Sequence, residues 1–196
     1  MTLRRQTGVT LIELLVTISI AAILMAVAVP GFQDFFRRTR IDTAASDFMA
    51  TLNYARSEAI RRGVTVSVCK SNGGTSCGGA GVNWEQGWIV FANLDNDSPA
   101  VVDAGEEIIR VHQQLAQGIT LRPNNNYTNF LTYRPDGRVN NIGTFAICHN
   151  NQRVGAKSIT IIGTGRARFG NDTNNDGIPE KDSGGASVNI TSCADP

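Results

Sequence analysis

Two arginines late in the 196-residue chain are the side chains best suited to bind an anionic ligand. Arg166 and Arg168 follow the glycine-rich segment 163–165, and if they continue the strand predicted before them, their spacing of two puts both guanidiniums on one face. Guanidinium groups bind phosphate with paired hydrogen bonds, and glycines let a phosphate backbone approach closely. Arg153 and Lys157 extend the predicted basic strip. The sequence leaves two alternatives, a phosphate-binding surface and an ordinary solvated strand face.

A second group of polar residues has the spacing of a calcium loop. Asp172, Asn174 and Asp176 supply oxygens at positions one, three and five, and a glycine follows them as in EF-hand loops. Position twelve is a serine where an EF-hand has a bidentate glutamate, so Glu180 or Asp182 has to close the site. The sequence thus leaves two alternatives, a weak calcium site and a polar turn in a flexible insertion.

The cysteines favour disulfide bonds over metal ligation. Four cysteines are an even number, in a chain whose N-terminus indicates export. We favour a bond between Cys69 and Cys77, which flank a Gly/Ser/Asn-rich loop, and one between Cys148 and Cys193, which ties down the C-terminal tail. Zinc is the alternative, but the sequence has no C-x-x-C pair and its two histidines lack ligand spacing.

Composition and motifs argue against several functional classes. The net charge of +1, with 18% charged residues, gives no general basic field that indicates a nucleic-acid partner. The sequence has no P-loop, nucleophile elbow or H-E-x-x-H motif, so we predict no enzymatic activity and, calcium aside, no cofactor. Asp95, Asp97 and Asp103 form a looser acidic group with a weaker claim to a metal.

The N-terminal segment contains one costly charge. From Val9 to Val29 there are twenty-one residues and one charged side chain, Glu13. A helix of this length is roughly 30 Å long and crosses a bilayer. An ionised carboxylate in such a segment usually has a designated partner, which makes Glu13 a candidate functional residue.

Three interpretations of this segment compete. A secretory signal cut at Ala26-Val27-Ala28 has its apolar core interrupted by Glu13, and a simple membrane anchor does not need a carboxylate. The third rests on residues 8–14, G-V-T-L-I-E-L, which closely resemble the class III signal of type IV pilins and of the pseudopilins of type II secretion.

That resemblance implies how the N-terminus is processed and used. A prepilin peptidase cuts after Gly8, the new terminus at Val9 is methylated, and Glu13 is the glutamate at the fifth mature position, although most members have phenylalanine where this chain has Val9. Pro30 lies where the family has a helix-kinking proline. A Val9 amine and a Glu13 carboxylate of neighbouring subunits can pair inside an apolar filament core and set its register. The precursor is then expected to be single-pass in the inner membrane, and the mature protein to join other pilin subunits in a surface pilus.

The elements that position these residues follow from hydrophobic periodicity. Apolar residues at steps of three and four predict a second, amphipathic helix half up to Gly63, a helix over residues 10–62 and a bend near Pro30. The resulting domains are a leader at 1–8, a hydrophobic helix at 9–30, an amphipathic half at 31–62 and a β-rich head at 63–196. Predicted strands are 64–69, 86–92, 107–115, 119–122, 129–134, 144–149, 157–163 and 186–192. Trp84 and Trp88 are expected to be core residues.

A long helix with an antiparallel β head is similar to the minor pilins and pseudopilins called GspH, FimT and FimU. Segments 69–91 and 105–110 fit that subgroup, and Gly-Arg-x-Arg at 165–168 resembles the DNA-binding motif of FimT-type pilins that serve natural transformation. The resemblance implies an α+β, type IV pilin-like fold. It also implies a minor pilin at or near the pilus tip, with extracellular DNA as a further partner. The alternatives are a minor pseudopilin of type II secretion and, if a secretory signal is cut near Val29, a calcium-dependent adhesin.

Overall fold

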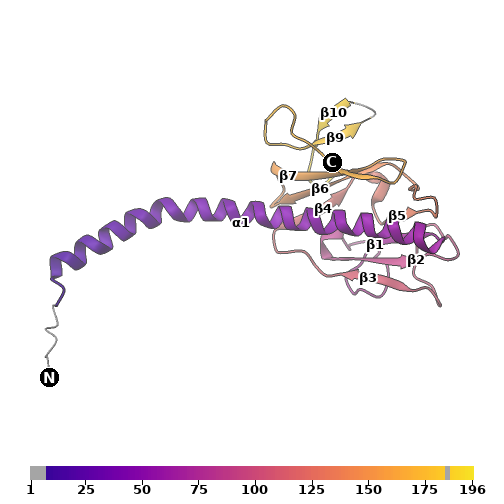
Figure 1. Ribbon diagram of the computed structural model, residues 1–196, viewed down its shortest axis with the longest axis horizontal. Coiled ribbons are helices and arrows are strands. Elements are labelled where there is room, and N and C mark those ends of the chain that lie inside the picture. Colours follow the sequence, from indigo (N-terminus) through magenta and orange to yellow (C-terminus); the bar gives the residue numbers. More distant parts are fainter. Residues whose placement is uncertain (1–7, 184–185) are drawn as a thin grey trace, which may run out of the picture. The chain divides into compact units, whose positions relative to one another are not determined.

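The computed structural model describes residues 8–183 and 186–196, and the chain divides into two compact units (Figure 1). The first unit ends at Arg38, and the second, which we call the head, covers Thr39–Pro196. Residues 1–7 of the predicted leader lie outside the described part. The head therefore contains the C-terminal part of the long helix together with the strands.

One long helix, α1, covers Leu11–Arg62. At its start, the side-chain oxygen of Thr10 accepts the N–H of Glu13 at 3.3 Å, as an N-cap residue does. At its end, Gly63 takes a φ of +67°, a left-handed conformation that favours glycine, and its N–H donates to a carbonyl of the last turn. The helix continues through position 30, and the side chain of Pro30 lies outside the described part, so the bend expected there stays a prediction.

Two antiparallel four-stranded sheets and a separate hairpin accompany the helix in the head. The first sheet has the order β3-β2-β1-β5, and its strands are β1 Val66–Lys70, β2 Trp88–Ala92, β3 Ile108–His112 and β5 Phe130–Tyr133. The second has the order β4-β6-β7-β8, and its strands are β4 Ile119–Pro123, β6 Gly143–His149, β7 Gln152–Ile161 and β8 Ala167–Phe169. The hairpin is β9 Glu180–Ser183 and β10 Ala186–Asn189, and the two short helices are η1 Trp84–Gln86 and η2 Asn125–Tyr127. The predicted α+β class, one long helix with an antiparallel head, is confirmed.

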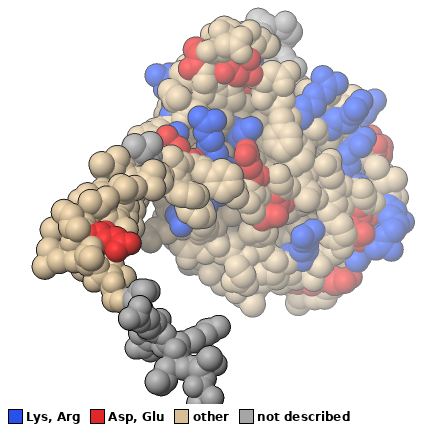
Figure 2. Space-filling view, turned by 60° about the vertical axis from the view of Figure 1, so that its left-hand side comes forward, with Lys and Arg blue, Asp and Glu red and all other residues tan. Residues whose placement is uncertain are grey.

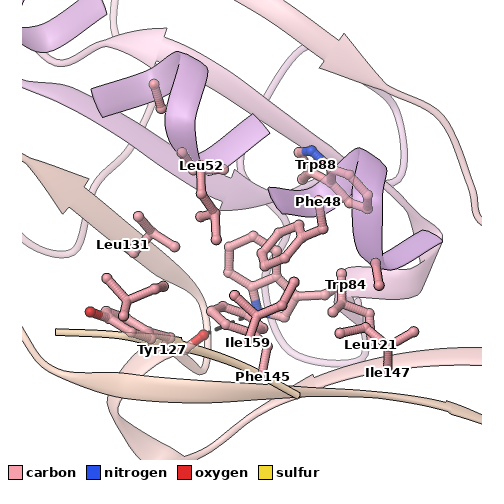
Figure 3. Close-up of a cluster of buried hydrophobic side chains, with 14 of the residues drawn as sticks. Phe48, Leu52, Trp84, Trp88, Leu121, Tyr127, Leu131, Phe145, Ile147 and Ile159 are labelled. Carbon is pink, nitrogen blue, oxygen red and sulfur yellow. Dashed lines mark hydrogen bonds between the residues drawn. The ribbon is translucent and has the colours of Figure 1, made fainter. Parts of the chain in front are cut away.

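The head part of α1 shares one core with both sheets. The apolar positions that periodicity assigns to this face are all buried: Ile41, Ala44, Ala45, Phe48, Leu52, Ala55 and Ala59. The ring of Phe48 makes edge contacts with Trp84, Trp88 and Phe145, at centroid distances of 5.8, 5.1 and 4.6 Å (Figure 3). The indole N–H of Trp88 donates to the hydroxyl of Thr51 at 3.1 Å. Both tryptophans are therefore core residues, as predicted.

Two of the predicted strands need correction. The strand expected at 157–163 covers Gln152–Ile161 instead, because Asn150 and Asn151, both with positive φ, form a two-residue turn that returns the chain directly from β6 into β7. The strand expected at 186–192 ends at Asn189 and pairs with β9, whose sequence E-K-D-S lacks the apolar alternation that indicates a strand.

The two disulfide bonds form between the cysteines favoured from the sequence. Cys69 bonds to Cys77 with a Cα–Cα distance of 5.5 Å, and Cys148 bonds to Cys193 with a Cα–Cα distance of 6.1 Å. The first bond closes the loop after β1. The second attaches the C-terminal tail to β6, where both cysteines are buried beside Ile190.

Candidate functional site

The N-terminal part of α1 has an apolar surface that nothing in its own unit covers. Large apolar side chains from Val9 to Phe36 are about half to three-quarters exposed, and by length and composition alone the helix is able to cross a membrane. Figure 2 shows this segment as an uncharged surface interrupted by an acidic patch, and Glu13 is its only charged residue before Asp34. Within the described residues, the Glu13 carboxylate has no hydrogen bond or ion pair. The segment thus presents an apolar surface and one charge that both need an external partner.

Two turns of the head lie in direct contact. One is the Pro-Asp-Gly turn at 135–137, and the other is the turn at 163–165, which connects β7 to β8. A Cβ added to Gly165 would lie 1.9 Å from the carbonyl oxygen of Gly137, and both glycines have positive φ, near +77°. The Nε of Arg56 on α1 donates to the same carbonyl at 3.0 Å. The two turns are therefore in close backbone contact, and only glycine fits at position 165.

Arginines flank this contact from three parts of the sequence. We call their surface the paired-turn surface, and its members are Arg56, Arg134, Arg138, Arg166 and Arg168. Apart from Arg56 they are exposed, and Arg138 has a 3.8 Å contact with the acidic residue of its own turn, Asp136. Among the described residues, the guanidiniums of Arg134, Arg166 and Arg168 have no hydrogen bond or ion pair. These groups are free to bind an external anion.

The structure corrects how Arg166 and Arg168 are positioned. They do not continue the strand that begins near Ser158. Instead, the chain reverses after Ile161, and Arg168 lies on β8 opposite Thr160 of β7. Their spacing of two still gives them a common side, because Ala167 between them packs against the core while both arginines are exposed.

The upstream half of the predicted strip does not join this surface. Lys157 is three residues before Thr160 on β7, so the two side chains lie on opposite faces of the sheet, and Thr160 shares its face with Arg168. The Lys157 ammonium pairs with Asp42 of α1 at 3.3 Å. Arg153 is seven residues before Thr160, roughly 23 Å along a strand. Its guanidinium contacts a carbonyl of the C-terminal tail at 3.5 Å.

Sequence reasoning did not identify three members of the surface: Arg56, Arg134 and Arg138. The two arginines that flank Pro135-Asp136-Gly137 were a usable signal, since a tight turn places the residues on either side of it close together. The contact between the two turns had no such signal. It joins residues 28 positions apart through backbone atoms of two glycines, which leave no apolar pattern in the sequence.

The predicted calcium loop is closed by its own hydrogen bonds. The carboxylate of Asp172 accepts two backbone N–H groups of the loop, at 3.1 and 2.8 Å, and that of Asp176 accepts a third at 2.8 Å. This backbone hydrogen bond is the main cause that lowers the pKa of Asp176. Glu180, one of the two closing candidates, is buried and accepts the N–H of Thr173 at 3.1 Å. The side chain of the other closing candidate, Asp182, lies outside the described part.

The looser acidic group comes together in space. Ligand oxygens of Asp95, Asp97 and Asp103 lie within 4.8 Å of one another. Burial raises the pKa of Asp97, and the charges of Asp95 and Asp103 raise it further, while Asn93 donates to its carboxylate at 2.9 Å. Such groups are common on exposed loops without a metal ion, so this geometry by itself assigns none.

Comparison with protein families matches both parts of the chain. Residues 44–165 match the family described as type II transport protein GspH, and residues 3–29 match the prokaryotic N-terminal methylation motif. Two curated fimbrial proteins of Pseudomonas aeruginosa are each 41% identical over 61 residues, which is 31% of this chain and 39% of theirs. The chain thus spans well under half the length of the curated relatives it matches.

Solved structures share the fold. The type IV minor pilin FimU of Pseudomonas aeruginosa aligns in two crystal forms, with TM-scores of 0.55 and 0.52 and sequence identities of 22% and 21%. The first alignment covers 81% of this chain and 98% of FimU. The sequence-based resemblance to pilin-like minor pilins and pseudopilins is thereby confirmed. The family and the fold are those of structural pilins rather than enzymes.

Proposed function

The chain belongs to the family of type II transport protein GspH, and from this premise we propose that it is a minor pilin at or near the tip of a type IV pilus, where its paired-turn surface binds DNA. Assembly with other pilin-like subunits follows from the family, and the N-terminal motif fits a membrane-anchored precursor that later enters a pilus. The position at the tip and the DNA partner do not follow from the family, and they are our proposal.

The proposed assembly depends on the uncovered N-terminal helix. Prepilin peptidase cuts after Gly8, and the methylated amine of Val9 pairs with Glu13 of a neighbouring subunit inside the apolar filament core. The support is the uncovered apolar surface with Glu13 as its one charge. Mass spectrometry of the mature protein is expected to find N-methylated Val9. A mature terminus near Val29 would instead identify a secretory signal and overturn the assignment of Gly8, Val9 and Glu13.

The proposed DNA contact depends on exposed, unpaired guanidiniums beside two turns that are in contact. Two to four phosphate contacts give a weak interaction that is strongly salt-dependent and has little sequence preference. The test is binding of the full-length protein, in a neutral detergent, to duplex DNA over a range of salt concentrations. The R166Q/R168Q variant is expected to weaken binding and to make the slope of log K against log salt shallower by about 2, because two phosphate contacts are lost.

A matched control comes from the same sheet. R153Q/K157Q also removes two positive charges, but the structure places these residues away from the paired-turn surface, so its salt slope is expected to stay that of the unmodified protein. Conversely, R134Q/R138Q is expected to behave like R166Q/R168Q. If R166Q/R168Q and R153Q/K157Q weaken binding equally, the contact is a general charge effect and the proposed surface is wrong.

The second candidate function is a minor pseudopilin of a type II secretion system, which the description of the matching family favours. In that case the head contacts other pseudopilins or an exported protein, and DNA binding is not needed. Deleting the gene separates the two: loss of pili or of DNA uptake supports the minor pilin. Loss of secreted hydrolases with normal pili and normal DNA uptake supports the pseudopilin and overturns our first proposal.

A further inference from the structure

A polar pocket opens at the seam between the two sheets, where β1 ends beside η1 and β4. Its volume is about 180 Å³. Two cationic side chains line it, Lys70 at the end of β1 and Arg122 on β4. The amide groups of Asn83 and Asn125 add hydrogen-bond donors to the lining, whereas the Thr128 hydroxyl already donates to the carbonyl of Asn125 at 3.0 Å.

Lys70 is the unusual member of this lining. The residue is 5% exposed, whereas lysine is almost never so deeply buried without a partner. Within the described residues, its ammonium takes part in no ion pair and no hydrogen bond. Burial lowers the pKa of Lys70, and the neighbouring positive charge of Arg122 lowers it further. The fold therefore buries most of the Lys70 side chain and leaves its ammonium at the pocket, with no ion-pair partner among the described residues.

Two carboxylates lie in or beside the pocket, those of Glu85 and Asp195, and among the described residues neither forms an ion pair with Lys70. The carboxylate of Glu85 accepts a hydrogen bond from the guanidinium of Arg122 at 2.7 Å and another from the backbone N–H of Leu121 at 3.5 Å. Arg122 also donates to the amide oxygen of Asn83 at 2.5 Å, which fixes the guanidinium at the pocket. Asp195 is part of the lining, but among the described residues it forms no ion pair with either cation. Lys70 thus has no ion-pair partner within the described residues.

We propose that this pocket binds a small oxyanion, either a carboxylate or a phosphate group, with Lys70 as its counter-ion and Arg122 as the second cation. A bound anion removes the cost of an unpaired buried charge, and the rigid Arg122–Glu85 pair keeps the second cation in place without ordering on binding. The site is separate from the paired-turn surface, because β4 and β8 are the two opposite edges of the second sheet.

Lysine titration tests the proposal directly. The sequence has three lysines, Lys70, Lys157 and Lys181, so the full-length protein labelled with ¹³Cε-lysine in neutral detergent should give three assignable signals. Sodium acetate and sodium phosphate are each titrated against sodium chloride at constant ionic strength. Saturating oxyanion is expected to raise the midpoint of Lys70 by about one pH unit or more and to leave the other two lysines unchanged.

The two anions distinguish the sources of the ligand. A shift with acetate alone identifies a carboxylate site, a shift with phosphate alone identifies a phosphate site, and a shift with both identifies a general oxyanion site. If neither anion moves the Lys70 signal more than chloride does, up to about 50 mM, the proposal is wrong, because an affinity weaker than millimolar corresponds to no specific site.

Variants provide the second readout. K70M keeps an unbranched side chain of similar length without the charge, and it is expected to weaken acetate or phosphate binding at least tenfold, as measured by the anion's effect on the thermal unfolding midpoint. K157M is the matched control, since it removes a lysine that pairs with Asp42 outside the pocket. Equal anion stabilisation in K70M and the unmodified protein would overturn the site. R166Q/R168Q is expected to retain anion binding, which keeps this test independent of the DNA proposal.

Discussion

The two parts of helix α1, one in the first unit and one in the head, differ in whether their apolar side chains are buried. Both carry an apolar surface along a continuous helix, but the part in the head buries Ile41, Phe48 and Leu52 almost completely, whereas Leu11, Ile23 and Phe32 in the first unit are more than half exposed. Burying apolar surface is favourable by roughly 25 cal/mol per Å², so leaving these side chains in water costs substantial free energy. The first part must therefore be covered by something outside its unit, and the head part is already covered by the chain itself.

Their carboxylates differ in the same way. Glu58, in the head part, is buried and accepts hydrogen bonds from Arg61 and Arg62 at 2.5 to 3.1 Å. Glu13, in the first part, has no charged partner within the described residues. A helix that supplies its own counter-charges in one part and leaves one charge unsatisfied in the other is suited to an assembly in which the missing partner comes from another molecule.

The largest effect is expected in the head part of α1, whose apolar side chains form the core. Phe48→Ala removes a ring that packs against Trp84, Trp88 and Phe145, and we expect it to lower the free energy of unfolding of the head by about 4 kcal/mol. Phe32→Ala, in the uncovered part, is the matched control and is expected to leave that free energy unchanged. Denaturant unfolding of the full chain in neutral detergent, followed by tryptophan fluorescence, measures both. Equal losses would mean that the two parts are not energetically distinct.

A smaller effect is expected from the carboxylates, and it depends on pH. Hydrogen bonds from Arg61 and Arg62 lower the pKa of Glu58, so its stabilisation is fully present above the ordinary value near 4.5 and is lost as the pH falls through the lower native value. We expect Glu58→Gln to cost about 1 kcal/mol at pH 7 and nothing once Glu58 is protonated, a modest figure because Arg61 is largely exposed.

Glu13→Gln is the counterpart in the uncovered part. It is expected to leave the pH dependence of head unfolding unchanged and to act on filament assembly instead. Unfolding curves recorded from pH 3 to pH 7 separate the two carboxylates. A pH-dependent loss of head stability in Glu13→Gln would show that its charge is engaged within the chain.

Local patterns account for what the sequence predicts correctly. The buried face of α1 repeats every three to four residues, and its cap at Thr10 and its stop at Gly63 are decided by neighbouring atoms, so both follow from composition and spacing. Strands with apolar alternation are found for the same reason. The polar strand β9 has no such pattern, since its sequence E-K-D-S lacks apolar alternation and its partner strand is β10 in a separate hairpin.

The candidate sites depend on contacts that spacing cannot reveal. The spacing of Arg166 and Arg168 correctly gives them a common side, but the glycines before them form a turn that packs on Gly137, and so they bring Arg134 and Arg138 to the same surface. Likewise, nothing in the sequence separates Lys70 from an exposed lysine, because its burial results from η1 and β4 meeting over the end of β1.

The smallest expected effect comes from surface ion pairs. It tests whether ion pairs in the two parts of α1 contribute differently to the stability of the head. Asp42 pairs with Lys157 of β7, which connects the helix to a sheet, whereas Asp34 pairs with Arg37 one turn away on the same helix. Both aspartates are more than half exposed, so we expect Asp42→Asn to cost the head only about 0.3 kcal/mol, and less at high salt because exposed charges are screened. Asp34→Asn is expected to have no effect on head unfolding, because its pair lies within the first unit. A double-mutant cycle of Asp42→Asn with Lys157→Gln measures the coupling, and a value that does not fall with salt would contradict a solvent-exposed pair.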